Sequence, residues 1–313
     1  MINSLKNKTL NLKKISFALL KFLIFILAFV YISSNFSFGK LDFLQIIEKS
    51  NYLYLLLSFF IYVIVFLVSV YKWMVLLNLF ISNKRVFLKL MRSCLKGLFV
   101  SNFMFGTLAG DVVRIHDQAK STGLSYKKSI AIAFFDRIYT LIFYILTILL
   151  SFYLIDLPEE FEFKAYINYI LILFAIFISI IILLKFLTKS NNNSSIIFYN
   201  KISNFKSLFK ILLLTTFSTL MMGLTFILIA KSLGCHIDIS QIFKVQIGLL
   251  ANYIPLSFSG WGLRELALIS LLRNSAQCGD GYILTASIIY GAYGLLISAP
   301  GFYFYIRSSK KGN

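Results

Sequence analysis

The chain has 313 residues, of which 59% are hydrophobic and only 14% are charged, and its formal net charge is +19 at pH 7. A soluble domain of this length could not bury so much apolar surface, so the composition indicates an integral membrane protein. The basic residues lie between apolar runs, where they set topology and contact anionic lipid headgroups. This placement argues against a nucleic-acid partner.

Six apolar runs are long enough to cross the ~30 Å hydrocarbon core of a bilayer as helices. The first follows several lysines, as in a signal peptide, but no small-residue cleavage site comes after it, so we expect an uncleaved span. Lys72 opens a basic loop after the second run. The predicted spans cover residues 15–31, 52–71, 137–154, 166–187, 209–230 and 282–306.

Two further apolar runs, residues 95–108 and 242–254, are too short to cross the bilayer at a rise of about 1.5 Å per residue. The second stops at Pro255, whose ring and missing N–H favour a break in the helix. We interpret both runs as re-entrant half-helices. Each is followed by a short amphipathic helix, predicted over residues 111–119 and 263–272.

A sequence pattern at the end of the first short run returns after the second. NFMFGTLAGDVVR (102–114) and NYIPLSFSGWGLR (252–264) share Asn, Gly and Arg at the same three places. Paired interrupted segments in the two halves of a membrane chain are typical of transporter sites near the midplane, although two polar loops could also agree by coincidence. The predicted break residues are Asn102, Gly106, Gly110, Asn252, Pro255, Gly260 and Gly262.

Lys and Arg concentrate in the segments that a cytoplasmic N-terminus would place inside, which predicts an N-in and C-in topology. Three predicted spans separate the two half-helices, so they would enter from opposite faces. We therefore expect an all-α, polytopic membrane protein: six transmembrane helices plus two re-entrant half-helices, in an inverted-repeat arrangement. Residues 1–313 form one domain, with halves 15–137 (re-entrant element 95–114) and 138–306 (re-entrant element 242–264).

The two arginines of the repeat are the leading candidates for binding an anionic headgroup. A guanidinium offers a planar fork for phosphate, and the start of a resumed helix adds backbone N–H groups and a positive dipole end. Asp111, Arg137 and Glu265 join Arg114 and Arg264 as candidate site residues.

Each candidate also has a structural interpretation. Asp111 and Arg114 are three residues apart and could pair along one helix face, whereas Arg264 and Glu265 adjoin and are expected to point to different faces. Either arginine could extend to the interface. Asp136–Arg137, at the head of a predicted span, could be a helix-packing ion pair, and Gln246 is a weaker polar candidate for the cleft.

The first motif with Asp136–Arg137, and the second motif extended to NYIPLSFSGWGLRE, resemble the lysylphosphatidylglycerol synthase transmembrane-region family of flippase-like proteins. The resemblance covers about residues 13–306. It departs from the family pattern at Gly106, where proline is usual, and at Ala109, where the first glycine of GGD is usual. It implies an inner-membrane protein that moves lipids, or a membrane partner of lipid-modifying enzymes. Fused members carry a cytosolic aminoacyl-transferase domain; here the sequence stops at Asn313, so we do not expect that activity.

These observations favour a translocase for an anionic, headgroup-modified or polyprenyl-phosphate-linked lipid, multi-pass in the cytoplasmic membrane. The alternative is a non-transporting scaffold for a separate aminoacyl- or glycosyltransferase. An intramembrane enzyme is disfavoured, because there is no HExxH, GxSxG or carboxylate pair within the spans. Cys94, Cys235 and Cys278 have no metal spacing and there are only two histidines, so we expect no metal or other cofactor. Nothing in the sequence specifies an oligomeric state.

Overall fold

The structure is a computed structural model that describes residues 43–79, 87–105, 107–154, 205–253 and 260–309. Every element in these ranges is helical. Three of the helices are long and apolar enough to cross a membrane: Tyr52–Asn78, Phe209–Ser232 and Asp280–Arg307. The chain is therefore a multi-pass helical membrane protein. The predicted spans 15–31 and 166–187, together with Gly106 and Pro255, lie outside the described residues.

A short helix, α2 (Phe43–Glu48), precedes four helices that follow one another along the chain as long, short, short and long. Asn51 caps α3, because its side chain accepts a hydrogen bond from the Leu53 amide at 3.0 Å. A π-helical turn, η1 (Ser101–Phe105), follows the first short helix. The four helices are α3 (Tyr52–Asn78), α4 (Phe87–Val100), α5 (Thr107–Thr122) and α6 (Tyr126–Leu154).

The same order of long, short, short and long helices returns in the second half of the chain. Two 3₁₀ turns, η2 (Ile239–Gln241) and η3 (Ala251–Tyr253), flank the first short helix there. The four helices are α9 (Phe205–Ser232), α10 (Ile242–Leu250), α11 (Leu263–Leu272) and α12 (Asp280–Ser309).

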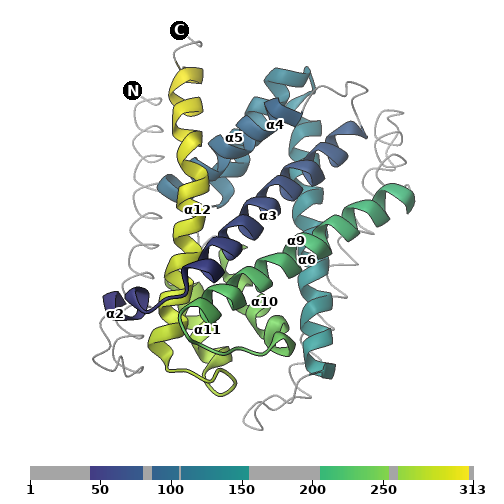
Figure 1. Cartoon of the computed structure of the whole chain (residues 1–313). Coiled ribbons are helices and arrows are strands. Elements are labelled where there is room, and N and C mark those ends of the chain that lie inside the picture. The colour runs from purple at the N-terminus through teal and green to yellow at the C-terminus, as the bar shows by residue number, and fades with distance from the viewer. Residues whose placement is uncertain (1–42, 80–86, 106, 155–204, 254–259, 310–313) are drawn as a thin grey trace, which may run out of the picture.

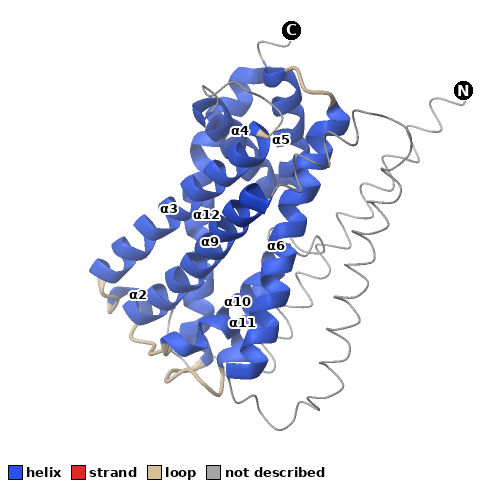
Figure 2. Cartoon of the chain, turned by 90° about the vertical axis from the view of Figure 1, so that its right-hand side faces the viewer, coloured by secondary structure: helices blue, strands red, loops and turns tan. Residues whose placement is uncertain are grey.

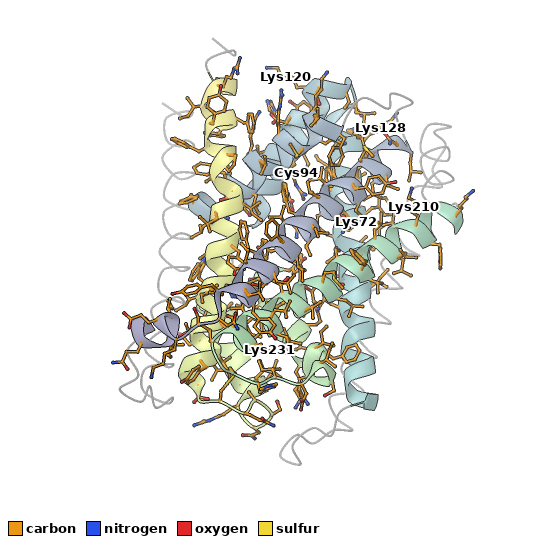
Figure 3. The ribbon with its side chains drawn as sticks, viewed as in Figure 1. Lys72, Cys94, Lys120, Lys128, Lys210 and Lys231 are labelled. Atoms are coloured by element: carbon orange, nitrogen blue, oxygen red, sulfur yellow. A yellow bond between two sulfur atoms is a disulfide. The ribbon has the colours of Figure 1, made fainter. Side chains whose placement is uncertain are left out.

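The two pairs of short helices lie at opposite ends of the molecule. In Figures 1 and 2, α4 and α5 lie near the C-terminal end of α12, whereas α10 and α11 lie near its N-terminal end. Figure 1 shows α6 and α12 on opposite sides, running in opposite directions, with α3 and α9 crossing between them. The labelled Lys120 and Lys128 lie at the α4–α5 end in Figure 3, and Lys231 lies toward the other.

Two clusters of buried apolar side chains hold this arrangement together, because burying apolar side chains against one another stabilises the packing of helices. One joins α9, α10, α11 and α12 around Phe226, Leu249 and Leu268. The other joins the second half of α3 to α4 and α6 around Trp73 and Ile132. A disulfide between Cys235 and Cys278 also ties the end of α9 to the start of α12. Cysteine spacing in the sequence had indicated no such pairing.

The observed helices extend beyond the predicted boundaries at three places that bear on the site. Helix α6 begins at Tyr126, upstream of the predicted span that starts at 137, so Asp136 and Arg137 lie inside a helix and not at its start. Helix α3 continues to Asn78, which places Lys72 inside it and not in a loop. Helix α5 begins at Thr107, so Gly110 is helical and not part of the break. Lys72, Asp136 and Arg137 can be helical there because they find charged partners inside the protein, and Gly110 because it packs closely against Gly97.

Candidate functional site

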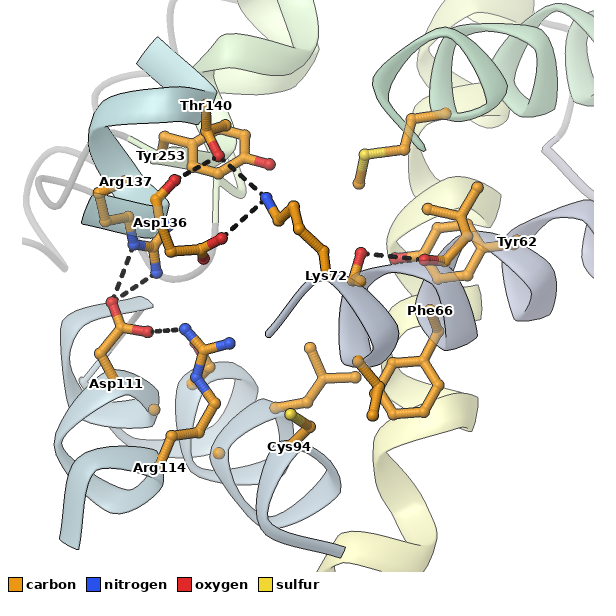
Figure 4. Close-up of a pocket in the computed structure, with 18 residues that line it drawn as sticks. Tyr62, Phe66, Lys72, Cys94, Asp111, Arg114, Asp136, Arg137, Thr140 and Tyr253 are labelled. Carbon is orange, nitrogen blue, oxygen red and sulfur yellow. Dashed lines mark hydrogen bonds and ion pairs between the residues drawn. The ribbon is translucent and has the colours of Figure 1, made fainter. Parts of the chain in front are cut away.

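A cavity of about 220 Å³ lies between α3, α4, α5 and α6, with Met222 of α9 and Tyr253 of η3 completing its wall. One part of the wall is apolar and includes Val65, Phe66 and Leu98. Another part is charged, and Figure 4 shows these side chains directed toward one another. The five charged residues that line the cavity are Lys72, Asp111, Arg114, Asp136 and Arg137.

Asp111 is shared by two arginines. Arg137 Nε and Nη2 donate to Asp111 Oδ2 at 2.9 and 2.6 Å, and Arg114 Nη2 donates to Asp111 Oδ1 (Figure 4). The pairing of Asp111 with Arg114 along one helix face is thus confirmed. The second partner comes from α6 and links it to α5 by charge-assisted hydrogen bonds, which are stronger than neutral ones.

Lys72 and Asp136 form a second ion pair across the cavity. Lys72 Nζ lies 2.9 Å from Asp136 Oδ1, and it donates a longer bond of 3.4 Å to Thr140 Oγ1. The two side chains are 9% and 12% exposed, so both charges are largely removed from solvent. Asp136 therefore makes an ion pair between helices, which was one of the two interpretations of Asp136–Arg137, and its partner lies on α3. The sequence had suggested no role for Lys72 because the apolar run ends just before it.

Aromatic rings fix the orientation of both arginines. The guanidinium of Arg114 lies 4.4 Å from the ring centroid of Trp73, and that of Arg137 lies 5.5 Å from the ring of Tyr253. A cation over an aromatic face is stabilised by the ring quadrupole while its N–H edges remain available. Tyr253 belongs to the second copy of the repeat, and Asp111 and Arg114 belong to the first, so both copies contribute to this cavity.

Arg264 has a different environment, although it occupies the position in the second repeat that Arg114 occupies in the first. It is 2% exposed, and Arg264 does not line the cavity. Its Nε donates to Ser287 Oγ at 2.8 Å and its Nη2 donates to Glu265 Oε1 at 2.6 Å. Nη2 also donates to the Ser287 carbonyl at 3.0 Å. The two bonds to Ser287 attach α11 to α12.

The expectation that Arg264 and Glu265 point to different faces was wrong. Glu265 is third in α11, and its Oε2 accepts a hydrogen bond of 2.6 Å from the Gly262 amide at the helix start. This cap draws the carboxylate back toward the N-terminus, where the long arginine side chain reaches its other oxygen. Arg264 then lies 5.1 and 5.6 Å from the ring centroids of Trp261 and Tyr290.

The second break depends on glycines in a left-handed conformation. Gly260 and Gly262 have φ angles of +89° and +87°, which residues other than glycine rarely adopt. A Cβ on Gly260 would also collide with the side chain of Asn252. That Asn252 side chain contacts Arg264 Nη1 at 3.5 Å, so the repeat residues of the second copy form one local unit.

In the first copy the repeat residues serve contacts between helices. Asn102 Nδ2 donates to the Gly294 carbonyl of α12 at 3.1 Å. Gly110 faces Gly97, and a Cβ on either residue would clash with the backbone of the other, so α4 and α5 pack closely. Gln246 donates to the Thr219 carbonyl of α9 and does not line the cavity.

These features define a helical, multi-pass membrane protein in which the described helices line a cavity that contains paired charges. Across the described residues no group of three or more His, Cys, Asp or Glu side chains is arranged to hold a metal ion.

The chain belongs to the family of the lysylphosphatidylglycerol synthase TM region, which matches residues 18–301. This confirms the resemblance carried by the repeated motifs and indicates a membrane protein involved in lipid handling. A comparison with curated proteins finds no match.

Proposed function

We propose that this protein is a lipid translocase that moves an anionic or headgroup-modified lipid between the leaflets of the cytoplasmic membrane. The observation that carries the proposal is the cavity, in which three cations and two carboxylates are gathered among membrane helices. Ionisable residues inside a membrane protein are expensive to bury and usually mark a substrate pathway. Arg114 and Arg137 share the single carboxylate of Asp111. A headgroup phosphate could therefore accept hydrogen bonds from the guanidinium N–H groups that Asp111 does not use.

The size of the cavity supports a headgroup site. Pockets that enclose whole ligands measure roughly 300–1,000 Å³, whereas this cavity measures about 220 Å³. It can hold a headgroup while the acyl chains remain outside. Val65, Phe66 and Leu98 would lie beside the first carbons of those chains. We propose transport and not catalysis, because the charged side chains are held in ion pairs with one another, an arrangement that suits the binding of a charged headgroup.

The helix arrangement supports a carrier with access from both leaflets. Short helices interrupted by non-α turns, in corresponding places of the two halves, are typical of carriers built from inverted repeats. In this proposal α4–α5 and α10–α11 are re-entrant hairpins that enter from opposite faces. The disulfide near α10–α11 suits the oxidising outer side, and the lysines near α4–α5 suit the cytoplasmic side.

Leaflet exchange in proteoliposomes tests the proposal. The purified chain is reconstituted, and exchange of fluorescent phosphatidylglycerol is measured by quenching the outer leaflet. We expect Arg114→Gln and Arg137→Gln to slow exchange at least tenfold, whereas Lys128→Gln, which removes an exposed charge, leaves it unchanged. Equal losses in all three variants would mean that bulk basic charge matters and not a site.

No acceleration over empty vesicles with several anionic headgroups would overturn the proposal. In that case the scaffold hypothesis predicts that a lipid-modifying enzyme copurifies with the chain, and that Arg114→Gln retains this partner. The two outcomes therefore separate a carrier from a membrane platform.

A further inference from the structure

The charges in the cavity add up to a defined net value. Lys72, Arg114 and Arg137 contribute three positive charges, and Asp111 and Asp136 contribute two negative ones. Each carboxylate has a cation within 2.9 Å, so both carboxylates are held in ion pairs. The net charge of the cavity is therefore +1. This inference rests on the headgroup site of the proposed function and goes on to name its substrate class.

We infer that the site selects headgroups that carry one net negative charge, which are phosphodiesters, over phosphomonoesters and zwitterionic headgroups. A single phosphodiester gives three anions for three cations, so that every charge in the cavity has a partner. The class includes phosphatidylglycerol and sugars linked to a lipid through one phosphodiester.

The Lys72–Asp136 pair leaves this count unchanged and adds a second carboxylate to the site. The two arginines and Asp111 already sum to +1, and the pair holds the carboxylate of Asp136 beside Arg137 (Figure 4). A dianionic phosphomonoester would leave one negative charge unpaired beside Asp136. A zwitterionic headgroup would leave the excess positive charge unbalanced. An unpaired charge in a largely buried site is strongly unfavourable, because it has lost water without gaining a partner.

The opposite order is expected if the cavity attracts anions only through general positive potential. The net charge of the whole chain is +19, and by that attraction the dianion should bind more tightly than the monoanion. The relative affinity for a monoester and a diester therefore distinguishes charge matching within the cavity from general electrostatic attraction.

The monoester provides its own pH control. Its second ionisation has a pKa of about 6, so it is largely a monoanion at pH 5 and a dianion at pH 8, whereas a diester stays a monoanion. If protein groups titrate between pH 5 and pH 8, the affinity for both ligands changes. The affinity for the diester, whose own charge is constant, therefore measures the contribution of the protein. The ionisable groups lining the cavity are Lys72, Asp111, Arg114, Asp136 and Arg137, with the Cys94 thiol and the Tyr62 and Tyr253 phenols.

Calorimetric titration of the purified full chain in a neutral detergent tests the inference. The probes are short-chain (dihexanoyl) phosphatidylglycerol, phosphatidate and phosphatidylcholine at pH 5 and pH 8. We expect phosphatidylglycerol to bind equally well, within about twofold, at both values. Phosphatidate should match it at pH 5 and bind at least tenfold more weakly at pH 8, and phosphatidylcholine should bind at least tenfold more weakly at both.

A soluble diester, glycerophosphoglycerol, distinguishes a lipid from a free phosphodiester as the ligand. The apolar wall predicts that dihexanoyl phosphatidylglycerol binds at least tenfold more tightly than this headgroup alone. Equal binding of the two would overturn the assignment of the site to a lipid.

Asp136→Asn raises the net charge of the cavity to +2 and should reverse the order of phosphatidate and phosphatidylglycerol at pH 8. Asp238→Asn is a matched control, because Asp238 is exposed and its side chain caps no helix. Tighter binding of phosphatidate than of phosphatidylglycerol by the wild-type chain at pH 8 would overturn the inference even if the variant does not fold. Binding in the expected order without leaflet exchange would overturn translocation and retain the selectivity.

Discussion

Arg137 on α6 donates two hydrogen bonds, 2.9 and 2.6 Å long, to one carboxylate oxygen of Asp111 on α5. The two residues are far apart in the sequence, and α5 also pairs Asp111 with Arg114 within its own helix. The short helix and the long helix are thus joined at the wall of the cavity. Under the proposed function, a headgroup phosphate that engages Arg137 would compete with this link, which would couple binding to the packing of α5 on α6.

Arg264→Gln should act mainly on stability. The variant leaves the buried Glu265 carboxylate without its cation, and removing one partner of a buried pair costs about 3–5 kcal/mol. We expect a lower midpoint in thermal unfolding of the purified chain in detergent. The double variant Arg264→Gln/Glu265→Gln should recover part of the loss. An unchanged unfolding midpoint together with lost leaflet exchange would instead place Arg264 in the substrate site.

Lys72 and Asp136 should show strong energetic coupling. We expect Lys72→Gln to destabilise the chain by about 3 kcal/mol, since it leaves Asp136 buried and unpaired. Lys72→Gln/Asp136→Asn should be less destabilised than Lys72→Gln alone. Chemical unfolding of the four forms gives the double-mutant cycle. Additive losses would contradict a direct ion pair.

Gly260→Ala should weaken the second break. The left-handed conformation costs a residue with a Cβ about 1–2 kcal/mol, and this Cβ would also displace Asn252. Gly279→Ala is the matched control, because no atom lies within 4 Å of the added Cβ. Thermal unfolding should show a loss of at least 1 kcal/mol for the first variant and none for the control. A neutral Gly260→Ala would mean that the break tolerates another conformation.

The disulfide gives a test of topology. If Cys235 and Cys278 lie on the outer side, a membrane-impermeant thiol reagent should label them in intact spheroplasts after reduction and not before. A Cys94→Ser background removes the buried free thiol at the cavity. Labelling seen in inverted vesicles but absent from spheroplasts would reverse the proposed orientation.

The sequence by itself determined that the chain is a helical membrane protein, since apolar runs of this length have no other stable environment. It also located the repeated segments around Asn102 and Asn252, because glycine, proline and the shortness of the runs act locally. Its local pairing of Asp111 with Arg114 was right for the same reason.

Tertiary structure alone decided which charges on different helices meet. Lys72 faces Asp136 and Arg137 reaches Asp111 because α3, α5 and α6 pack together, and no spacing along the chain encodes that approach. Packing also gave different environments to the two arginines that occupy the same position in the sequence repeat. Arg114 lines the cavity, whereas Arg264 is enclosed by Glu265 and Ser287. Ion pairs between helices depend on how whole helices are placed, so they follow from the fold and not from the local pattern.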